Sequence, residues 1–382
     1  MKIFHNMMLA DVVTGGFSHG LFKWFKYQAA VEIDFNVMAY GDNSIIIDLA
    51  NQKGLDTNLV RSFPIFGPKS LAISPKALLS VLKGEWDDFD LCHQHGIWSF
   101  STIVSIAWGK RTGKPVIIQP HGTLFPETLA ISANKKRIAL KTYEGYNIKK
   151  AACIVTTSEH EKQAVKSLFQ QKKIELIKIL ADVPTIVPKD IVISIRNKYD
   201  LCKDDYWLYL GRIHPKKGLD ILIEAYNDVA ERIPLVIVGI NEAPKYLDLI
   251  IKRIKKHGLT HHIRFLPPVT EIEKLALMRG AKAFILPTRS ENFGNVVAEA
   301  LGQQCPVICT KGAPWQTLEA YKCGWWTDIS VDGIAKALRL SKAQSLAEKI
   351  SMGERGPILL DKELNPYEIG KQTRMIYQSY TK

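Results

Sequence analysis

The chain of 382 residues lacks any long apolar segment. Its longest uncharged run near the middle, Gly96 to Gly109, contains serines and is shorter than the roughly 18–20 apolar residues that a membrane-spanning helix needs. The first eleven residues have a broken apolar stretch and no small-residue cleavage site, so we expect a first strand there and no signal peptide. These absences predict a cytoplasmic protein.

Cysteine is sparse, and the six cysteines show no C-x-x-C spacing. Most of them lie beside apolar residues, so we expect small buried side chains and no disulfide framework or zinc site. The segment Asp88-Phe89-Asp90 matches a D-x-D metal motif, but it precedes a strand at its amino end, where α/β folds do not place ligands. It is expected to be a solvated turn, and no metal site is predicted.

Acidic residues are fewer than basic ones, 38 against 51, which gives a formal net charge of +13. The overall composition is that of a globular protein. The densest local excess of positive charge includes Lys135, Lys136, Arg137 and Lys141. Such a segment suits an anionic membrane surface or a pyrophosphate-bearing lipid, although an ordinary solvated helix face explains it equally well. Nucleic acid is disfavoured, because no reader motif accompanies the charge.

The length suits two domains, since single cores rarely exceed about 250–300 residues. Short apolar runs alternate with helical stretches in both halves, which predicts parallel sheets with crossover helices. In the first half, strands are expected at 45–49, 90–94, 115–119 and 152–156, with helices at 134–150 and 159–169. In the second half, strands are expected at 206–212, 235–239, 263–266, 283–286 and 306–309.

Residues 181–205 lose this periodicity and carry two prolines, which predicts a linker. The fold class expected is α/β, with two Rossmann-like doubly wound domains at 1–180 and 181–365 facing a central cleft. A helix within 366–382 is expected to pack back on the first domain. Ligands in such folds bind at the carboxyl ends of the strands.

The most informative segment follows the expected strand at 283–286 and places Glu291 and Glu299 eight positions apart. Gly294, between them, is where a helix is expected to begin, and a helix start after a strand binds phosphorylated ligands. One carboxylate in the loop and another on the helix suit two hydroxyl-rich parts of one ligand. This pattern indicates a sugar nucleotide.

A second motif runs from Gly211 to Gly218 between an apolar strand and a helix. Its glycines permit a tight turn, and Arg212 and Lys217 can converge on one anion. Such a pair suits a pyrophosphate leaving group that gains negative charge during reaction.

These two motifs together resemble those of the retaining glycosyltransferases of family 4, which have the two-domain GT-B fold. The family's E-x7-E motif matches Glu291 through Glu299, and its G-R-x-x-x-x-K-G motif matches Gly211 to Gly218. The segment at 179–184 departs from the family's usual Pro-Asn-Gly-Val, so the domain boundary between 180 and 205 stays open.

The resemblance implies a role for each matching residue. Arg212 and Lys217 hold the donor diphosphate, Glu291 contacts the transferred sugar, and Glu299 accepts hydrogen bonds from the ribose. The backbone of Asn292, Phe293 and Gly294 lies against the sugar and its phosphate. In the first domain, His121 corresponds to the family histidine near the transferred sugar, and Gly15 and Gly16 to its glycine loop near the phosphates.

His95 and Trp98 follow another strand and are interpreted as lining the acceptor side, with a purely structural role as the alternative. The resulting hypothesis is a retaining, metal-independent enzyme with a UDP- or GDP-linked donor and no cofactor. Its acceptor is expected to be a lipid-linked or lipopolysaccharide saccharide at the inner face of the cytoplasmic membrane. The alternatives are a nicotinamide-dependent oxidoreductase, for which the chain lacks G-x-G-x-x-G, and a non-catalytic basic binding protein.

Overall fold

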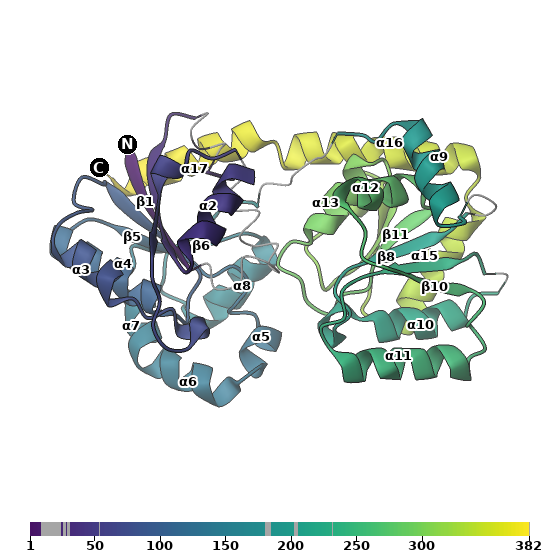
Figure 1. Ribbon diagram of the computed structural model, residues 1–382, viewed down its shortest axis with the longest axis horizontal. Helices are drawn as coiled ribbons and strands as arrows, with labels where there is room; N and C mark the ends of the chain where they lie inside the picture. The colour runs from purple at the N-terminus through teal and green to yellow at the C-terminus, as the bar shows by residue number, and fades with distance from the viewer. Residues whose placement is uncertain are drawn as a thin grey trace. The chain divides into compact units, whose positions relative to one another are not determined.

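The computed structural model describes residues 1–8, 24–25, 28, 31–52, 54–179, 185–201, 205–230 and 232–381. The chain divides into two compact units (Figure 1). Unit 1 comprises Met1–Leu180 with Leu364–Lys382, and unit 2 comprises Ala181–Glu363. Each unit has its own parallel sheet with helices between successive strands, which is the α/β architecture that the sequence predicts.

Unit 1 contains a seven-stranded sheet in the order β3-β2-β1-β4-β5-β6-β7. The strand order reverses between β1 and β4, which is where doubly wound sheets bind ligands. The strands are β1 (Lys2–Met8), β2 (Asp34–Tyr40), β3 (Val60–Phe63), β4 (Leu91–His95), β5 (Val116–Gln119), β6 (Cys153–Thr156) and β7 (Ile174–Leu176). The helices are α2 (Asn43–Gln52), α3 (Pro75–Leu82), α4 (Phe100–Thr112), α5 (Pro126–Ala130), α6 (Ala133–Lys141), α7 (Tyr143–Lys150), α8 (Glu159–Leu168) and α17 (Pro366–Tyr380).

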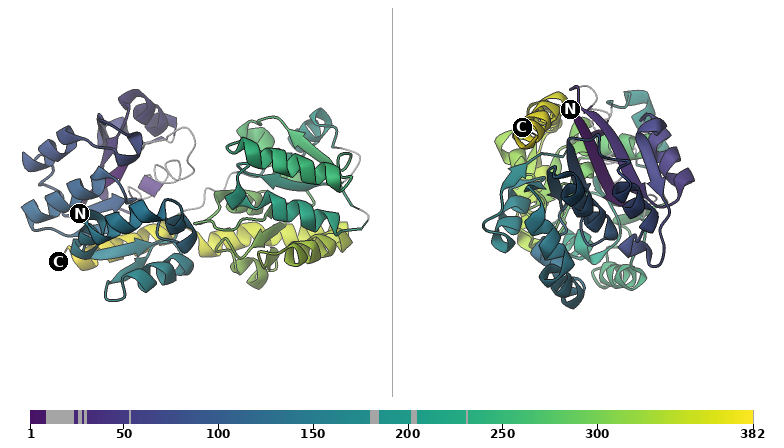
Figure 2. Two further views of the ribbon diagram at one scale, coloured as in Figure 1. Left: turned by 90° about the horizontal axis from the view of Figure 1, so that it is seen from below. Right: turned by 90° about the vertical axis from the view of Figure 1, so that its left-hand side faces the viewer.

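The C-terminal helix α17 belongs to unit 1 although it lies last in the chain. Ile369 and Tyr377 are buried in the same apolar cluster as Ile3 of β1. The two termini lie close together in this unit, with Met1 Sδ and Thr381 Oγ1 3.8 Å apart (Figure 2). The C-terminal segment therefore completes the core of unit 1.

Unit 2 contains a six-stranded sheet in the order β10-β9-β8-β11-β12-β13, and here the order reverses between β8 and β11. Its strands are β8 (Trp207–Leu210), β9 (Leu235–Val238), β10 (Ile263–Leu266), β11 (Ala283–Leu286), β12 (Val307–Thr310) and β13 (Gly324–Thr327). Its helices are α9 (Lys189–Lys198), α10 (Leu219–Asn227), α11 (Pro244–Lys256), α12 (Glu271–Gly280), α13 (Asn295–Gly302), α14 (Thr317–Ala320), α15 (Val331–Ala343) and α16 (Leu346–Glu363).

The strand predicted at 45–49 is wrong, because these residues lie in helix α2. Ile46, Leu49 and Ala50 are its buried residues, and this spacing of three and four places them on one helical face. Asp42 accepts a hydrogen bond from the Ser44 amide at the start of this helix. The helix connects β2 and β3, two strands that the sequence reasoning missed.

Two further expectations need correction. The single helix expected at 134–150 is divided into α6 and α7 at Thr142, whose φ and ψ of −111° are not helical. A Cβ added at Gly145, in the first turn of α7, would lie 1.8 Å from the Leu140 carbonyl oxygen. The glycine thus permits a close approach that a straight helix lacks. The linker expected at 181–205 contains α9, which packs on α12 through Val192 and Arg196 beside Gly280.

Among the residues that the structure describes, no helix is both long and apolar enough to cross a membrane. The five described cysteines are buried and free, which confirms their expected packing role. The strands expected in the second half are all found, and the helix expected at the C-terminus is α17.

Candidate functional site

The two motifs of unit 2 lie side by side at the carboxyl ends of β8 and β11. The short 3-10 helix Pro215–Lys217 follows β8, and the segment that bears Glu291 follows β11. The backbone joins them, because the Arg289 amide donates to the Lys216 carbonyl oxygen at 2.9 Å. Gly218 has a φ of +70°, and a Cβ there would lie 1.9 Å from the Pro287 carbonyl oxygen. The two loops therefore meet only because residue 218 is glycine.

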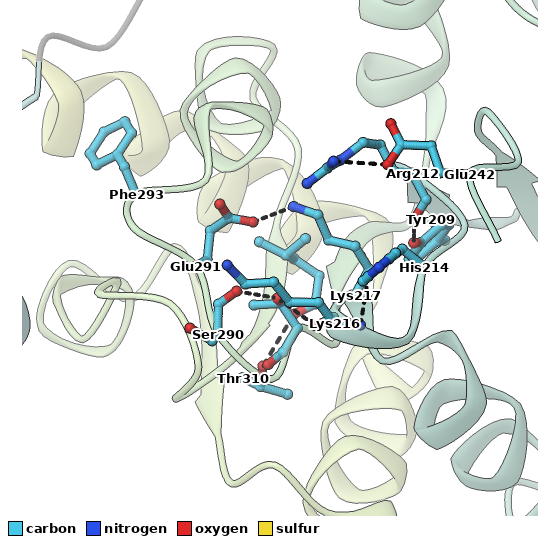
Figure 3. Close-up of polar contacts among 12 residues, drawn as sticks. Tyr209, Arg212, His214, Lys216, Lys217, Glu242, Ser290, Glu291, Phe293 and Thr310 are labelled. Carbon is cyan, nitrogen blue, oxygen red and sulfur yellow. Dashed lines mark hydrogen bonds and ion pairs between the residues drawn. The ribbon is translucent and has the colours of Figure 1, made fainter. Parts of the chain in front are cut away.

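Lys217 and Glu291 form an ion pair across this junction (Figure 3). Their side chains are 13% and 19% exposed, so the pair is largely shielded from water but still accessible from one side. The Glu291 amide donates to the Gly312 carbonyl oxygen at 2.7 Å, which fixes the loop behind the carboxylate. The structure therefore brings together two of the residues predicted to contact the donor.

Arg212 extends in the same direction as Lys217 in this view and pairs with Glu242, with 2.8 Å between Nη1 and Oε2 (Figure 3). The Arg212 side chain is 48% exposed, so its guanidinium can exchange this partner for an anion at little cost. Tyr209 donates from its hydroxyl to the Arg212 carbonyl oxygen at 2.9 Å and holds the backbone of the turn.

A second brace lies beneath the loops and was not found from the sequence. Arg289 forms a two-pronged contact with Asp220 of α10, at 2.8 and 2.7 Å, and Tyr246 donates to the same carboxylate at 2.6 Å. Burial alone raises the pKa of Asp220, but the hydrogen bonds from Arg289 and Tyr246 outweigh it and lower the pKa overall. Asp220 therefore remains charged and ties the segment after β11 to helix α10.

Gly294 is the N-cap of helix α13, close to where the sequence predicts the helix to begin. Its φ of +85° is a left-handed conformation that glycine adopts without strain. Trp315 donates from its ring nitrogen to the Phe293 carbonyl oxygen, and the two rings lie 5.0 Å apart. The first amides of a helix lack partners within the helix, so the start of α13 offers donors and a positive dipole end to an anion.

Glu299 lies on α13 and pairs with Lys274 of α12, with 2.8 Å between Oε2 and Nζ. Burial opposes the charge on Lys274, but the carboxylates of Glu299 and Glu271 outweigh it and raise the Lys274 pKa. Val297, Ala298, Ala300 and Leu301 form the buried face of α13, and Val296 is only partly buried. Lys274 could not be found from the sequence, because nothing in its spacing links it to residue 299.

In unit 1, His121 follows β5 in a left-handed conformation with a φ of +54°. Glu161 of α8 holds this turn, because its carboxylate accepts from the Gly122 amide and, at 2.8 Å, from the Thr157 amide. His121 Nε2 lies 3.2 Å from His95 Nδ1. His95 is buried, so the structure gives it a neighbour in His121 and no exposed face.

Trp98 also has a left-handed backbone, with a φ of +76°, and its amide donates to Glu144 of α7 at 3.0 Å. Burial raises the pKa of Glu144 to about 7. Lys136 of α6 lies 6.0 Å from the Trp98 ring centroid and donates to the Thr128 carbonyl oxygen. Lys136 is thus partly buried, whereas Lys135, Arg137 and Lys141 are exposed.

Gly15 and Gly16 lie outside the described residues. Three histidines come close together within unit 1, and the sequence singled out only His95 among them. His5, His93 and His95 are buried, and each offers a ring nitrogen within 4.8 Å of the others. The signal in the sequence was a histidine inside the apolar first strand, at position 5.

The two halves of the chain each match a family model. Residues 193–355 match the glycosyl transferases group 1, and residues 48–178 match the glycosyl transferase 4-like domain. The chain belongs to the family 4 glycosyltransferases. This glycosyltransferase chain has the GT-B fold of two Rossmann-like units, which confirms the fold and family expected from the two motifs.

Curated relatives carry glycosyltransferase names, and solved structures share the fold. A D-inositol 3-phosphate glycosyltransferase of Frankia alni is 26% identical over 58% of this chain and 57% of that protein, so the chain spans little more than half of this relative's length. A GDP-mannose:cellobiosyl-diphosphopolyprenol alpha-mannosyltransferase of Xanthomonas campestris is 25% identical over 73% of this chain and 70% of that protein. The structure of Anabaena Alr3699/HepE in complex with UDP-glucose is 17% identical, with a TM-score of 0.77 over 99% of this chain and all of that one.

Proposed function

We propose that this glycosyltransferase moves a sugar from a nucleotide-diphosphate donor to a glycan acceptor with retention of the anomeric configuration. The observation that carries the proposal is the joining of the two loops by the Lys217–Glu291 ion pair beside the start of α13. A cation, a carboxylate and free helix amides then surround one position at the ligand-binding edge of the sheet. These are the groups that a phosphorylated sugar requires.

Each residue is assigned a part of the donor. Lys217 and Arg212 bind the diphosphate and stabilise its charge as the sugar leaves. Glu291 accepts hydrogen bonds from the transferred sugar, and the backbone at Gly294 lies against the sugar phosphate. Glu299 accepts hydrogen bonds from the ribose hydroxyls, and Lys274 keeps that carboxylate oriented. His121 contributes a contact to the transferred sugar from unit 1.

The mechanism proposed needs no metal and no covalent glycosyl-enzyme. Arg212, Lys217 and the start of α13 supply the positive charge that a metal provides in other transferases. Both carboxylates are committed to ion pairs, Glu291 with Lys217 and Glu299 with Lys274, so we assign neither as a nucleophile. The acceptor hydroxyl attacks the face that the phosphate leaves, and the leaving phosphate takes its proton through an oxocarbenium-like transition state.

A thermal-shift screen with UDP-, GDP-, ADP- and TDP-sugars tests the donor class. We propose a UDP- or GDP-linked donor, because the Anabaena structure is a complex with UDP-glucose and the Xanthomonas relative is named for GDP-mannose. Binding stabilises the folded chain in proportion to the logarithm of ligand concentration over Kd. Glu299→Gln should reduce the rise in Tm that the nucleotide causes and leave the rise caused by inorganic pyrophosphate unchanged. Equal loss of both shifts would contradict the ribose role of Glu299.

We further propose a lipid-linked saccharide acceptor, reached by peripheral contact with an anionic membrane. Ile131 and Ile138, 60% and 63% exposed, belong to the same short segment as the exposed cations Lys135, Arg137 and Lys141. Apolar and basic side chains on one surface suit a helix that lies in a lipid interface. The relative from Xanthomonas is named for a diphosphopolyprenol-linked acceptor, which supports the same class.

Charge reversal tests this contact. The triple variant Lys135→Glu, Arg137→Glu and Lys141→Glu should bind vesicles of phosphatidylcholine with phosphatidylglycerol at least about 100-fold more weakly, since each cation contributes about 1 kcal/mol. The matched control reverses Lys252, Lys255 and Lys256, three exposed lysines of α11 in unit 2. Unchanged binding of the first variant, or an equal loss in the control, overturns the membrane contact at α6.

A further inference from the structure

We propose that His95, His5 and Gln28 form a hydrogen-bonded relay that sets the tautomer of His121, with the proton of His121 on Nε2. The relay crosses neighbouring elements of unit 1. In the register of the parallel strands, His5 of β1 lies opposite His93 of β4, and His95 lies opposite Gln119 of β5, two residues before His121. The register therefore places His5 and His95 on one path toward the turn that carries His121.

The contacts along this path are short and continuous. Gln28 Oε1 lies 2.8 Å from His5 Nε2, and His5 Nδ1 lies 2.9 Å from His95 Nε2. His95 Nδ1 lies 3.2 Å from His121 Nε2. Each pair of facing atoms is within hydrogen-bond distance, so every link needs one donor and one acceptor.

The acceptor at the end of the path, Gln28 Oε1, determines which nitrogen of each histidine carries the proton. Gln28 Oε1 carries only lone pairs, so His5 must donate from Nε2 and accept at Nδ1. His95 then donates from Nε2 to His5 and accepts at Nδ1, which leaves His121 to donate from Nε2. The proton order is unique as long as each ring is neutral.

The surroundings keep the rings neutral and the amide of Gln28 oriented. Burial lowers the pKa of His5 and of His121 to about 3 and holds the pKa of His95 well below its usual range. Gln28 Nε2 faces the Tyr377 hydroxyl at 3.4 Å, and that hydroxyl lies 2.7 Å from His93 Nδ1. The hydroxyl accepts from Gln28 and donates to His93, so the carbonyl oxygen of Gln28 points to His5.

The same histidines are close enough to be considered as metal ligands, but their orientation favours the relay. The rings of His93 and His95 are stacked, with centroids 4.0 Å apart and planes at 27°. Imidazole lone pairs lie in the ring plane, so near-parallel rings do not aim them at one point. The facing nitrogens of His5 and His95 are also already at hydrogen-bond distance.

The consequence for the reaction rests on the role proposed for His121. A neutral ring that donates to His95 presents Nδ1 as its other nitrogen, which can only accept a hydrogen bond. Nδ1 of His121 would therefore accept a hydrogen bond from a sugar hydroxyl. The opposite tautomer would place two acceptor nitrogens, His95 Nδ1 and His121 Nε2, face to face. His95, which we assigned to the acceptor side, becomes a positioning residue instead.

Long-range ¹H–¹⁵N correlation spectra of the full chain, labelled with ¹⁵N-histidine, test the relay without any activity assay. We expect His5, His95 and His121 to carry the proton on Nε2 alone at pH 7, with signals assigned from single His→Gln variants. Gln28→Leu removes the terminal acceptor and should give mixed tautomers at His121. Tyr40→Phe is the matched control, because it removes a buried hydroxyl of unit 1 whose partner, Met38 Sδ, is not part of the path.

Three results overturn the relay: a proton on Nδ1 of His121, a charged ring among the three at pH 7, or zinc bound to the purified chain. With the donor identified, Gln28→Leu should lower kcat by about tenfold with little change in KM, whereas Tyr40→Phe should leave both unchanged. Unchanged kcat of Gln28→Leu overturns the positioning role. Absence of transferase activity in the unaltered chain would sink the proposed function alone, since the tautomers are read independently.

Discussion

Lys217→Ala is expected to lower turnover by at least about tenfold, and by up to about 10³-fold, while the protein remains folded. The ammonium of Lys217 is assigned to the leaving diphosphate, whose negative charge grows as the bond to the sugar breaks. Loss of this contact affects the transition state more than the bound donor, so kcat should fall more than donor affinity. Initial rates over a range of donor concentrations measure how the loss divides between kcat and donor affinity.

The control for this variant is Lys198→Ala. Lys198 also pairs with a glutamate, Glu273, but lies on α9, which is not part of the proposed site. Both variants remove one lysine from one ion pair, so a general effect of charge or stability appears in both. Near-normal turnover of Lys217→Ala, or an equal loss in Lys198→Ala, contradicts the assignment of Lys217.

Gly218→Ala is expected to destabilise unit 2 by about 3–5 kcal/mol and to abolish donor binding, because it pushes the two loops apart. The added Cβ would lie 1.9 Å from a backbone oxygen, which cannot rotate away as a side chain would. A left-handed backbone adds strain for any residue with a Cβ. Denaturant unfolding of the full chain, followed with and without donor, measures both effects.

Gly258→Ala is the control that separates backbone strain from the close contact of an added Cβ. Gly258 has a φ of +67°, nearly that of Gly218, but nothing lies within 4 Å of its added Cβ. Its substitution should cost only the backbone strain, about 1–2 kcal/mol, and leave donor binding intact. If Gly218→Ala were no more damaging than Gly258→Ala, the close contact between the two loops would not hold the site together.

The sequence predicted unit 2 better than unit 1, for a physical reason. Four strands of unit 2, β8 to β11, are short and mainly apolar runs followed directly by glycine or proline, and a buried parallel strand needs little more. Residues 45–49 of unit 1 are also apolar except for Asp48, yet they form a helix, because Ile46, Leu49 and Ala50 match its buried face. In a run of about five residues, neither the hydrophobic period nor the length distinguishes a strand from a helix.

The candidate site was predictable only where its residues are adjacent in the chain. Glu291 and Gly294 belong to one segment, and Lys217 and Gly218 to another, so each motif carries its own spacing. Lys274 reaches Glu299 from a different helix. Asp220 and Arg289 also meet only after folding, 69 positions apart. Such contacts depend on the strand order, which places β8 beside β11.

The histidines of unit 1 show the same limit. His95 and His121 were singled out separately because each follows a strand. His5 was not, because one polar residue in an apolar strand gives no partner from sequence alone. Register between β1 and β4 places His5 opposite His93, and only then does a path of hydrogen bonds become visible.

The stereochemistry of donor hydrolysis tests the central claim most directly. The unaltered chain is incubated with the sugar nucleotide that stabilises it most, and the anomeric proton of the released sugar is followed by NMR before mutarotation. We expect slow release of a sugar with the anomeric configuration of the donor, at a rate that Lys217→Ala lowers at least about tenfold. Release of the inverted anomer, or no release from UDP-, GDP-, ADP- or TDP-sugars, would contradict the account.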